Sequence, residues 1–218
     1  MNESLLDQIR NNLINISANS PVLTNPAAPD KLYEIFIFTC VVRALRRIGA
    51  YIEVRESNDQ QTNNIIFRLG PGRIYAPFSA PGFIYVRYNN NEYEIQNGLR
   101  VSGRSHVLHE LDVCIIKRDE ANRCRKNQID PVQNSIIFLA ECKYYGTPLP
   151  LHLGREYLGL CSEFSIRVKT IISNSGSIEI HNLVTKHGGT ENFSISPSNP
   201  NNVDTFIQWL ANELRQVL

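Results

Sequence analysis

One stretch decides the fold: Ser135-Ile136-Ile137-Phe138-Leu139-Ala140-Glu141-Cys142-Lys143. Its first part is continuously apolar and rich in β-branched and aromatic residues, which is typical of a strand buried on both faces. Glu141 and Lys143 then follow at positions i and i+2. Because alternate residues of a strand point to the same face, we expect a carboxylate and an ammonium group side by side at the end of a core strand.

A second acidic group stands at the start of another apolar run. His109-Glu110-Leu111-Asp112 leads directly into Val113-Cys114-Ile115-Ile116. Glu110 shares its strand parity with Asp112, so it is expected on the same face as a reserve acid. Two acids and a lysine on neighbouring strands are the side chains of a divalent-metal phosphodiesterase site.

The rest of the chain predicts a mixed sheet flanked by helices, an α/β or α+β fold. Asp30 is expected at a helix N-cap and Gly49 at the end of that helix. The segments form one domain over residues 1–218, with a core at about 30–184. Helices are predicted at 3–18, 31–48, 152–164 and 203–217. Besides the two strands around the apolar runs 113–116 and 136–139, strands are predicted at 51–56, 65–69, 83–88, 93–96, 167–172 and 178–184.

Composition limits the class of protein. The chain is 42% hydrophobic and 20% charged, as is ordinary for a soluble globular domain. Its net charge of +1 gives no global positive field, so any nucleic-acid surface must be local. Five cysteines without a C-x-x-C pair indicate reduced thiols in a cytoplasmic protein. No basic leader and no membrane-length apolar stretch are present, which predicts no membrane association.

Glu34 on the early helix, Asp112 on one strand and Glu141-x-Lys143 on the next together resemble the PD-(D/E)XK nuclease superfamily. The resemblance covers roughly residues 31–48 and 108–170, and it implies a restriction-endonuclease-like core. The chain departs from the pattern in two respects. Leu111 stands where a proline often precedes the first acid, and the wide gap from Asp112 to Glu141 implies an insertion in the hairpin.

The resemblance also implies a division of labour in the site. Asp112, Glu141 and the backbone carbonyl of Cys142 would bind Mg²⁺, which prefers oxygen ligands and for which Mn²⁺ would substitute. Glu34 would act through a water or hold a second metal. Lys143 would orient or deprotonate the attacking water and counter the charge of the transition state. A nearby metal and partial burial would depress the pKa of this lysine.

Basic side chains for contact with nucleic acid are expected outside this set. Gly103 and Arg104 lie in a polar turn that either contacts phosphate or is a plain turn. The connection 117–126 either grips a DNA backbone or is a solvated excursion. The basic residues in question are Arg104, Lys117, Arg118, Arg123, Arg125 and Lys126.

Other motifs are interpreted as structural rather than functional. Gly70-Pro71-Gly72 lacks the G-K-[ST] of a P-loop, which argues against nucleotide hydrolysis. His106 and His109 have no third ligand at suitable spacing, so they are interpreted as structural. The alternative for Glu34 is an ordinary acid that the helix macrodipole favours near the N-terminus.

The sequence therefore predicts a Mg²⁺-dependent endonuclease acting on DNA, in a restriction or anti-phage defence setting. Because one such site cuts one strand, a homodimer or a subunit of a larger nuclease complex is expected. Two alternatives remain open. The same fold serves as a non-catalytic nucleic-acid-binding or assembly module, or the substrate is RNA or a branched DNA structure.

Overall fold

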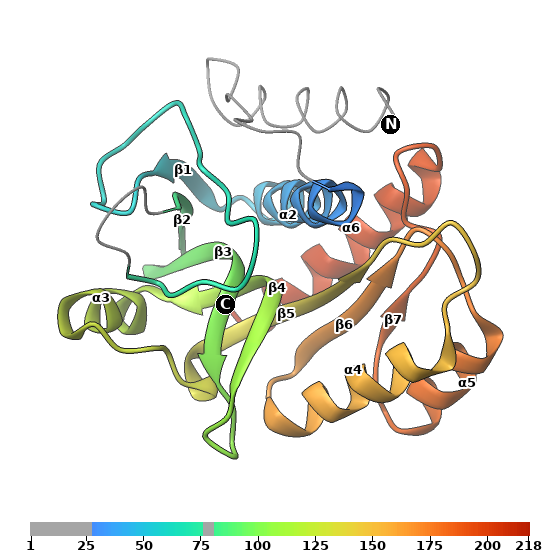
Figure 1. Ribbon diagram of the computed structural model, residues 1–218. Helices are drawn as coiled ribbons and strands as arrows, with labels where there is room; N and C mark the ends of the chain where they lie inside the picture. Colours follow the sequence, from blue (N-terminus) through green and yellow to red (C-terminus); the bar gives the residue numbers. More distant parts are fainter. Residues whose placement is uncertain (1–27, 76–80) are drawn as a thin grey trace.

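The computed structural model describes residues 28–75 and 81–218, so the helix predicted at 3–18 lies outside the described residues. No helix in these two ranges is long and apolar enough to cross a bilayer. Figure 1 shows the helices arranged around a central sheet. The helices are α2 (Pro29–Arg47), α3 (Arg118–Asn127), α4 (Leu151–Glu163), α5 (Ile178–Lys186) and α6 (Pro200–Arg215).

The sheet contains seven strands in the same order as the sequence. The successive pairs from β1–β2 to β4–β5 are antiparallel, whereas β5–β6 and β6–β7 are parallel pairs. Asn89 and Asn90 both have positive φ, 49° and 64°, which suits the two-residue turn of the β2–β3 hairpin. The strands are β1 (Tyr51–Arg55), β2 (Phe83–Tyr88), β3 (Asn91–Ser102), β4 (Leu108–Lys117), β5 (Ile136–Lys143), β6 (Val168–Ser173) and β7 (Glu191–Asn192). The predicted mixed α/β class is therefore confirmed.

α2 and α6 lie side by side on one face of the sheet, where they form the largest apolar cluster of the described chain (Figure 1). Pro29 occupies the first turn of α2, a position that needs no backbone donor. The predicted N-cap was wrong: Ala28 precedes the helix, and Asp30 lies inside the first turn. Gly49 follows the helix with a φ of +86°, which a residue with a Cβ rarely adopts, so the predicted helix end is correct.

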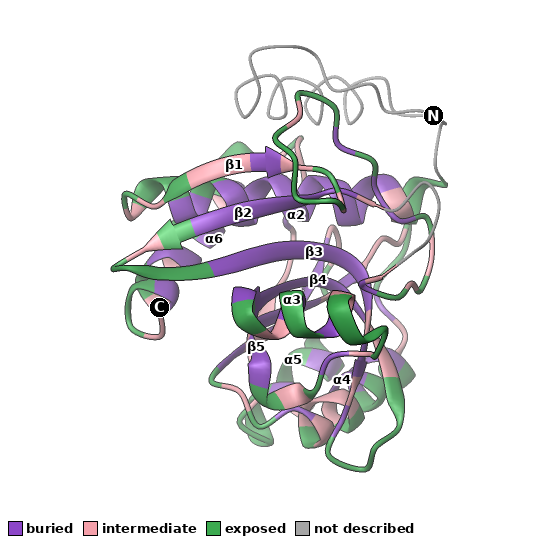
Figure 2. Cartoon of the chain, turned by 90° about the vertical axis from the view of Figure 1, so that its left-hand side faces the viewer, coloured by how far each residue is buried: buried purple, intermediate pink, exposed green. Residues whose placement is uncertain are grey.

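The opposite face is covered by α4 and α5 near β6, and by α3 near β3 and β4. Leu153 and Tyr157 of α4 pack with Ile180 and Val184 of α5 over Ile171 of β6. Figure 2 shows that the outer side of α3 is exposed, whereas the middle of β3 is buried. The sheet thus has one deeply covered face and one that is covered in patches.

Three sequence predictions are wrong. Residues 65–69 form no strand, although Ile65 and Phe67 are buried, because the main chain there bonds to loops and side chains. Residues 178–184 form helix α5, which begins at Ser177, whose hydroxyl accepts a hydrogen bond from the Ile180 amide. The connection 117–126, interpreted as a loop, contains helix α3.

Candidate functional site

The strands β4 and β5 separate at the candidate site. Their ladder ends at the pair Val113–Ala140, so Asp112 is the first residue of β4 beyond it. Asp112 Oδ2 accepts a hydrogen bond from the Cys142 backbone N–H over 2.7 Å. The carboxylate therefore substitutes for the main-chain partner that the ladder no longer supplies, and it is held at 8% exposure.

Glu141 and Lys143 leave β5 on the same face, as the strand parity predicts. Lys143 Nζ lies 2.7 Å from Glu141 Oε1, and both side chains are half-buried. The Cys142 side chain between them points into the apolar core with α2. The alternation of this strand thus separates the core residue from the charged pair.

Glu34 comes to the same place from α2. It is only 5% exposed, and its Oε1 accepts a hydrogen bond from Lys31 Nζ at 2.8 Å, one turn earlier on the helix. Its second oxygen, Oε2, is buried without a hydrogen-bond partner. Lys31 Nζ also lies 3.6 Å from Glu110 Oε1 on β4, so the lysine connects the helix to the strand.

These side chains line one cavity of about 380 Å³. A neighbouring cavity of about 550 Å³ lies between β4, β5 and α4, and it shares Glu110 and Glu141 with the first. The first cavity thus gathers all four sequence-predicted catalytic residues and the reserve acid. Its lining is Asp30, Lys31, Glu34, Glu110, Asp112, Glu141, Cys142, Lys143, Tyr144 and Tyr145.

The electrostatics of the cavity reflect crowded carboxylates. Burial raises the pKa of Asp112 well above its usual range, and the negative charges of Glu141 and Glu34 raise it further. Burial also raises the pKa of Glu34 to about 7, although Lys31 opposes the shift. Two of the buried acids therefore bind protons more tightly than free side chains do.

Lys143 behaves differently from the sequence-based expectation. Burial lowers its pKa, but the charge and hydrogen bond of Glu141, with the charge of Asp112, outweigh burial and raise the pKa above its ordinary value. In this arrangement the amine is therefore protonated at neutral pH. The expected depression of the lysine pKa depends on a nearby metal ion as well as on burial, and burial alone is outweighed by the carboxylates of Glu141 and Asp112.

The donor set suits a hard divalent cation, since the cavity offers several carboxylate oxygens. Glu34 Oε2 has no hydrogen-bond partner, and Asp112 Oδ2 accepts from the Cys142 N–H, so both carboxyl groups retain acceptor capacity for a cation. However, no group of three or more His, Cys, Asp or Glu side chains is arranged to hold a metal within residues 28–75 and 81–218. Glu34 and Glu141 are each turned toward a lysine instead. The side chains fit a cation in chemistry, and in each of these two acids Oε1 contacts the lysine while Oε2 is outside that contact.

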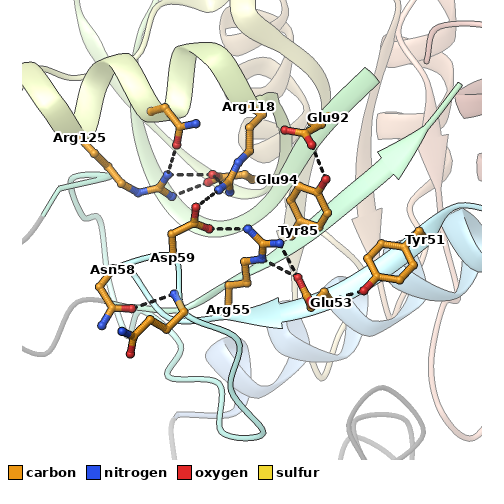
Figure 3. Close-up of polar contacts among 12 residues, drawn as sticks. Tyr51, Glu53, Arg55, Asn58, Asp59, Tyr85, Glu92, Glu94, Arg118 and Arg125 are labelled. Carbon is orange, nitrogen blue, oxygen red and sulfur yellow. Dashed lines mark hydrogen bonds and ion pairs between the residues drawn. The ribbon is translucent and has the colours of Figure 1, made fainter. Parts of the chain in front are cut away.

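Two of the predicted nucleic-acid residues lie elsewhere, in a buried ion cluster. Arg118 and Arg125 of α3 donate to the two carboxylate oxygens of Glu94 on β3, and Arg118 also pairs with Asp59 (Figure 3). Arg118 is almost fully buried. These two arginines therefore face inward and stabilise the packing of α3 on the sheet.

The remaining basic candidates are at the surface. Arg123 is paired with Glu120, and Arg104 donates to Ser165. Lys117 and Lys126 are exposed. Because α3 begins six residues beyond Asp112, it starts about 20 Å along β4 from the cavity. The structure does not bring these residues into the acid cavity.

Sequence reasoning missed two features of the site. Lys31 was not singled out, although its i, i+3 spacing to Glu34 on a helix was a usable signal. Asn174 holds the Tyr145 backbone from both sides: it accepts from the Tyr145 N–H and donates to the Tyr145 carbonyl, each at 2.8 Å. This second contact joins segments 29 residues apart, so no local pattern could have indicated it.

Comparison of the chain with protein-family models, with curated proteins and with solved structures finds no match. The fold and the site define the protein as a mixed α/β protein with an acid-and-lysine cavity where two antiparallel strands separate. Any functional conclusion therefore rests on the residues of this cavity.

Proposed function

We propose that the protein is a Mg²⁺-dependent endonuclease that hydrolyses DNA phosphodiester bonds on a restriction-endonuclease-like core. A single observation carries the proposal: Glu34, Asp112, Glu141 and Lys143, from one helix and two adjacent strands, line the same cavity. These are the residues on which the resemblance to the PD-(D/E)XK superfamily rests. The mixed sheet with helices on both faces agrees with the core that this resemblance implies.

The acids would hold the cation. Asp112 and Glu141 supply carboxylate oxygens, the Cys142 carbonyl adds a main-chain oxygen, and Glu34 acts through a water. A bound divalent ion neutralises phosphate charge and makes a water more acidic. Burial and the charges of Glu141 and Glu34 raise the pKa of Asp112, and a bound cation would offset the repulsive part of that shift, which supports this assignment.

Lys143 would stabilise charge on the phosphate. Its ammonium group holds its proton beside Glu141, since the neighbouring carboxylates outweigh the effect of burial. A fixed positive charge next to the reacting phosphate favours the extra negative charge of the transition state. This arrangement favours the electrostatic role of Lys143 over proton abstraction. Tyr144 and Tyr145 line the same cavity, where they would contact the nucleotide beside the scissile bond.

The setting of the enzyme is part of the proposal. All five cysteines are free, which agrees with a reducing cytoplasm. One site of this type cuts one strand, so cleavage of a duplex requires a homodimer or a second encounter. A restriction or anti-phage defence system, with the chain alone or as the nuclease subunit of a larger complex, fits these properties.

A second candidate is a non-catalytic nucleic-acid-binding module of the same fold. The observation that favours it is that Glu34 and Glu141 are each paired with a lysine, and that no three-acid metal group is assembled within the described residues. Metal binding separates the two candidates, because a purely structural cavity would retain its ammonium–carboxylate pairs in the presence of Mg²⁺.

The test is a nicking assay on supercoiled plasmid with Mg²⁺, Mn²⁺ or EDTA, beside Lys143→Met and Asp112→Asn. Lys186→Met is the matched control, since Lys186 is exposed on α5. We expect metal-dependent nicking by the wild type and the control, and loss in both site variants. Equal nicking by all four proteins would identify a contaminant. Parallel branched DNA and RNA substrates assign the substrate class, and cleavage of RNA alone would contradict the DNA assignment.

A further inference from the structure

Lys31 contacts different acids of the cavity from the one that Lys143 contacts. Its Nζ is 2.8 Å from Glu34 Oε1 and 3.6 Å from Glu110 Oε1, so one ammonium group contacts acids from α2 and β4. The side chain is 18% exposed, which leaves it largely inside the cavity. Lys143 is paired with Glu141 on β5 in the same way.

The two lysines divide the acids of the cavity. Lys143 compensates Glu141, and Lys31 compensates the pair formed by Glu34 and Glu110. Asp112 has no ammonium partner within ion-pair distance, and its Oδ2 is bound only by the Cys142 N–H in the described structure. Among the buried and half-buried acids of the cavity, Asp112 is therefore the one with the least compensation.

The pair Glu34 and Glu110 has the properties of a second cation position. The Glu34 side chain is only 7% exposed, and the residue lines the cavity. Its Oε2 atom has no hydrogen-bond partner. Glu110 Oε1 is likewise buried without a hydrogen bond. A divalent ion placed between these carboxylates would meet the Lys31 ammonium group, whose positive charge repels it.

We propose that Lys31 is a built-in second cation, so that the site takes one divalent ion, at Asp112 and Glu141, while the ammonium group occupies the position that a second ion would take between Glu34 and Glu110. This inference rests on the metal site of the proposed function. It goes beyond that function because it predicts how many ions bind and names a residue outside the sequence motif that limits this number.

The inference predicts what neutral substitutions of Lys31 do. Removing the ammonium group leaves Glu34 and Glu110 as two facing carboxylates with a free oxygen, which is an oxygen donor set for Mg²⁺ or Mn²⁺. Arginine at the same position keeps the positive charge and so keeps the second position closed. Removing Glu110 as well takes away half of the donors, which abolishes the second position.

The experiment counts Mn²⁺ ions per chain by titration of the full-length protein, with the free-ion signal followed by electron paramagnetic resonance. We expect one ion for the wild type, for Lys31→Arg and for the surface control Lys186→Met. Lys31→Met and Lys31→Gln are expected to bind a second ion, and Lys31→Met with Glu110→Gln is expected to return to one. Circular dichroism checks that each variant is folded. If Lys31→Met does not fold, the ion count of Lys31→Gln decides the test.

The outcomes separate the inference from the proposed function. Two ions in the wild type, or one ion in both neutral variants, would overturn the role of Lys31 while metal binding and nicking by the wild type still support the nuclease. A second ion in Lys31→Arg would also overturn it, because the charge is retained. Absence of Mn²⁺ binding by every protein in the series would overturn both.

Discussion

Two buried acids on neighbouring strands, Glu94 and Asp112, differ in how far basic side chains compensate their charge. Glu94 on β3 is fully buried, and both of its oxygens are bound: Oε1 accepts from Arg118 at 2.6 Å and from Arg125 at 2.8 Å, while Oε2 accepts from Gln96 at 2.7 Å. Asp112 on β4 is nearly as buried but accepts one hydrogen bond, from the Cys142 backbone N–H, and has like charges nearby. The first acid is matched by cations, and the second is not.

Under the proposed function, the difference separates a charge that serves the fold from one that serves a ligand. A buried ion pair with satisfied hydrogen bonds maintains a unique packing arrangement, here of α3 on β3. A buried acid left without a cation costs stability, and such groups are concentrated at functional sites. Five carboxylates and two ammonium groups line the cavity that contains Asp112. The imbalance is what a divalent cation would correct.

The largest expected effect on stability concerns Glu94, the acid whose charge is compensated by arginines. Glu94→Gln removes the charge that faces Arg118 and Arg125, which leaves Arg125 without a carboxylate partner and buried Arg118 with Asp59 alone. We expect the free energy of unfolding to fall by about 3–5 kcal/mol, measured by urea denaturation. The exposed Glu56→Gln is the control, with a change within about 0.5 kcal/mol. An equal effect of the two substitutions would remove one half of the comparison.

On the unmatched side, Asp112→Asn is expected to separate function from stability. Loss of the charge should lower Mg²⁺-dependent nicking by at least about 10²-fold. The urea midpoint in EDTA should stay the same or rise, since repulsion from Glu141 and Glu34 is relieved while the side chain still accepts from Cys142. A large loss of stability would mean that Asp112 is as structural as Glu94.

The pH dependence of stability should have opposite signs in the two regions. Burial raises the Glu34 pKa to about 7, so the charged acid is unfavourable in the fold, and its contribution is lost as pH rises from about 4.5 to 7. Burial also acts to raise the Asp59 pKa, but Arg55 and Arg118 outweigh it and lower that pKa. The stabilisation from Asp59 is therefore present above its unfolded pKa and lost as pH falls.

These signs are read from isosteric variants by urea denaturation in EDTA at several pH values. Glu34→Gln should become more stable relative to the wild type between pH 5 and pH 8, by on the order of 1–3 kcal/mol. Asp59→Asn should be less stable than the wild type above about pH 4 and approach it at lower pH. The same direction of change in both variants would contradict the contrast.

The smallest expected effect concerns the exposed lysines of the α3 region. Lys117→Ala with Lys126→Ala should leave stability within about 0.5 kcal/mol, because both side chains are exposed. If this surface contacts a DNA backbone, the salt dependence of binding should weaken by about one unit of slope per lost contact. Filter binding of a catalytically inactive Asp112→Asn background at several salt concentrations measures it. An unchanged slope would show that DNA does not contact this surface.

The sequence predicted those parts of the fold in which local pattern and packing agree. The strand around Phe138 and the helix around Phe36 are long apolar runs, and both are found where the pattern indicated. α5 was read as a strand because Ile178, Ile180 and Val184 fit both periods over a short window. Their helical state depends on packing with α4, which a local window does not contain.

Sequence patterns did not predict α3 or the full arrangement of the site. α3 buries only Arg118, Ala121 and Cys124, so it has almost no apolar stripe, and its stability comes from ion pairs to Glu94, far away in the sequence. The acids of β4 and β5 were found because strand parity fixes their direction, whereas Glu34 on α2 was found through the resemblance. Lys31 was missed because its second contact, with Glu110, crosses from α2 to β4.

The hydrogen bond from the Cys142 backbone N–H to Asp112 gives the protein an internal reporter. That amide is protected from exchange with solvent deuterium by a side chain, where its strand neighbours rely on main-chain carbonyls. A cation that engages the Asp112 carboxylate competes for the same oxygen, so the deuterium uptake of one peptide spanning β5 changes when the cavity fills. Occupancy could then be followed without any substrate at all.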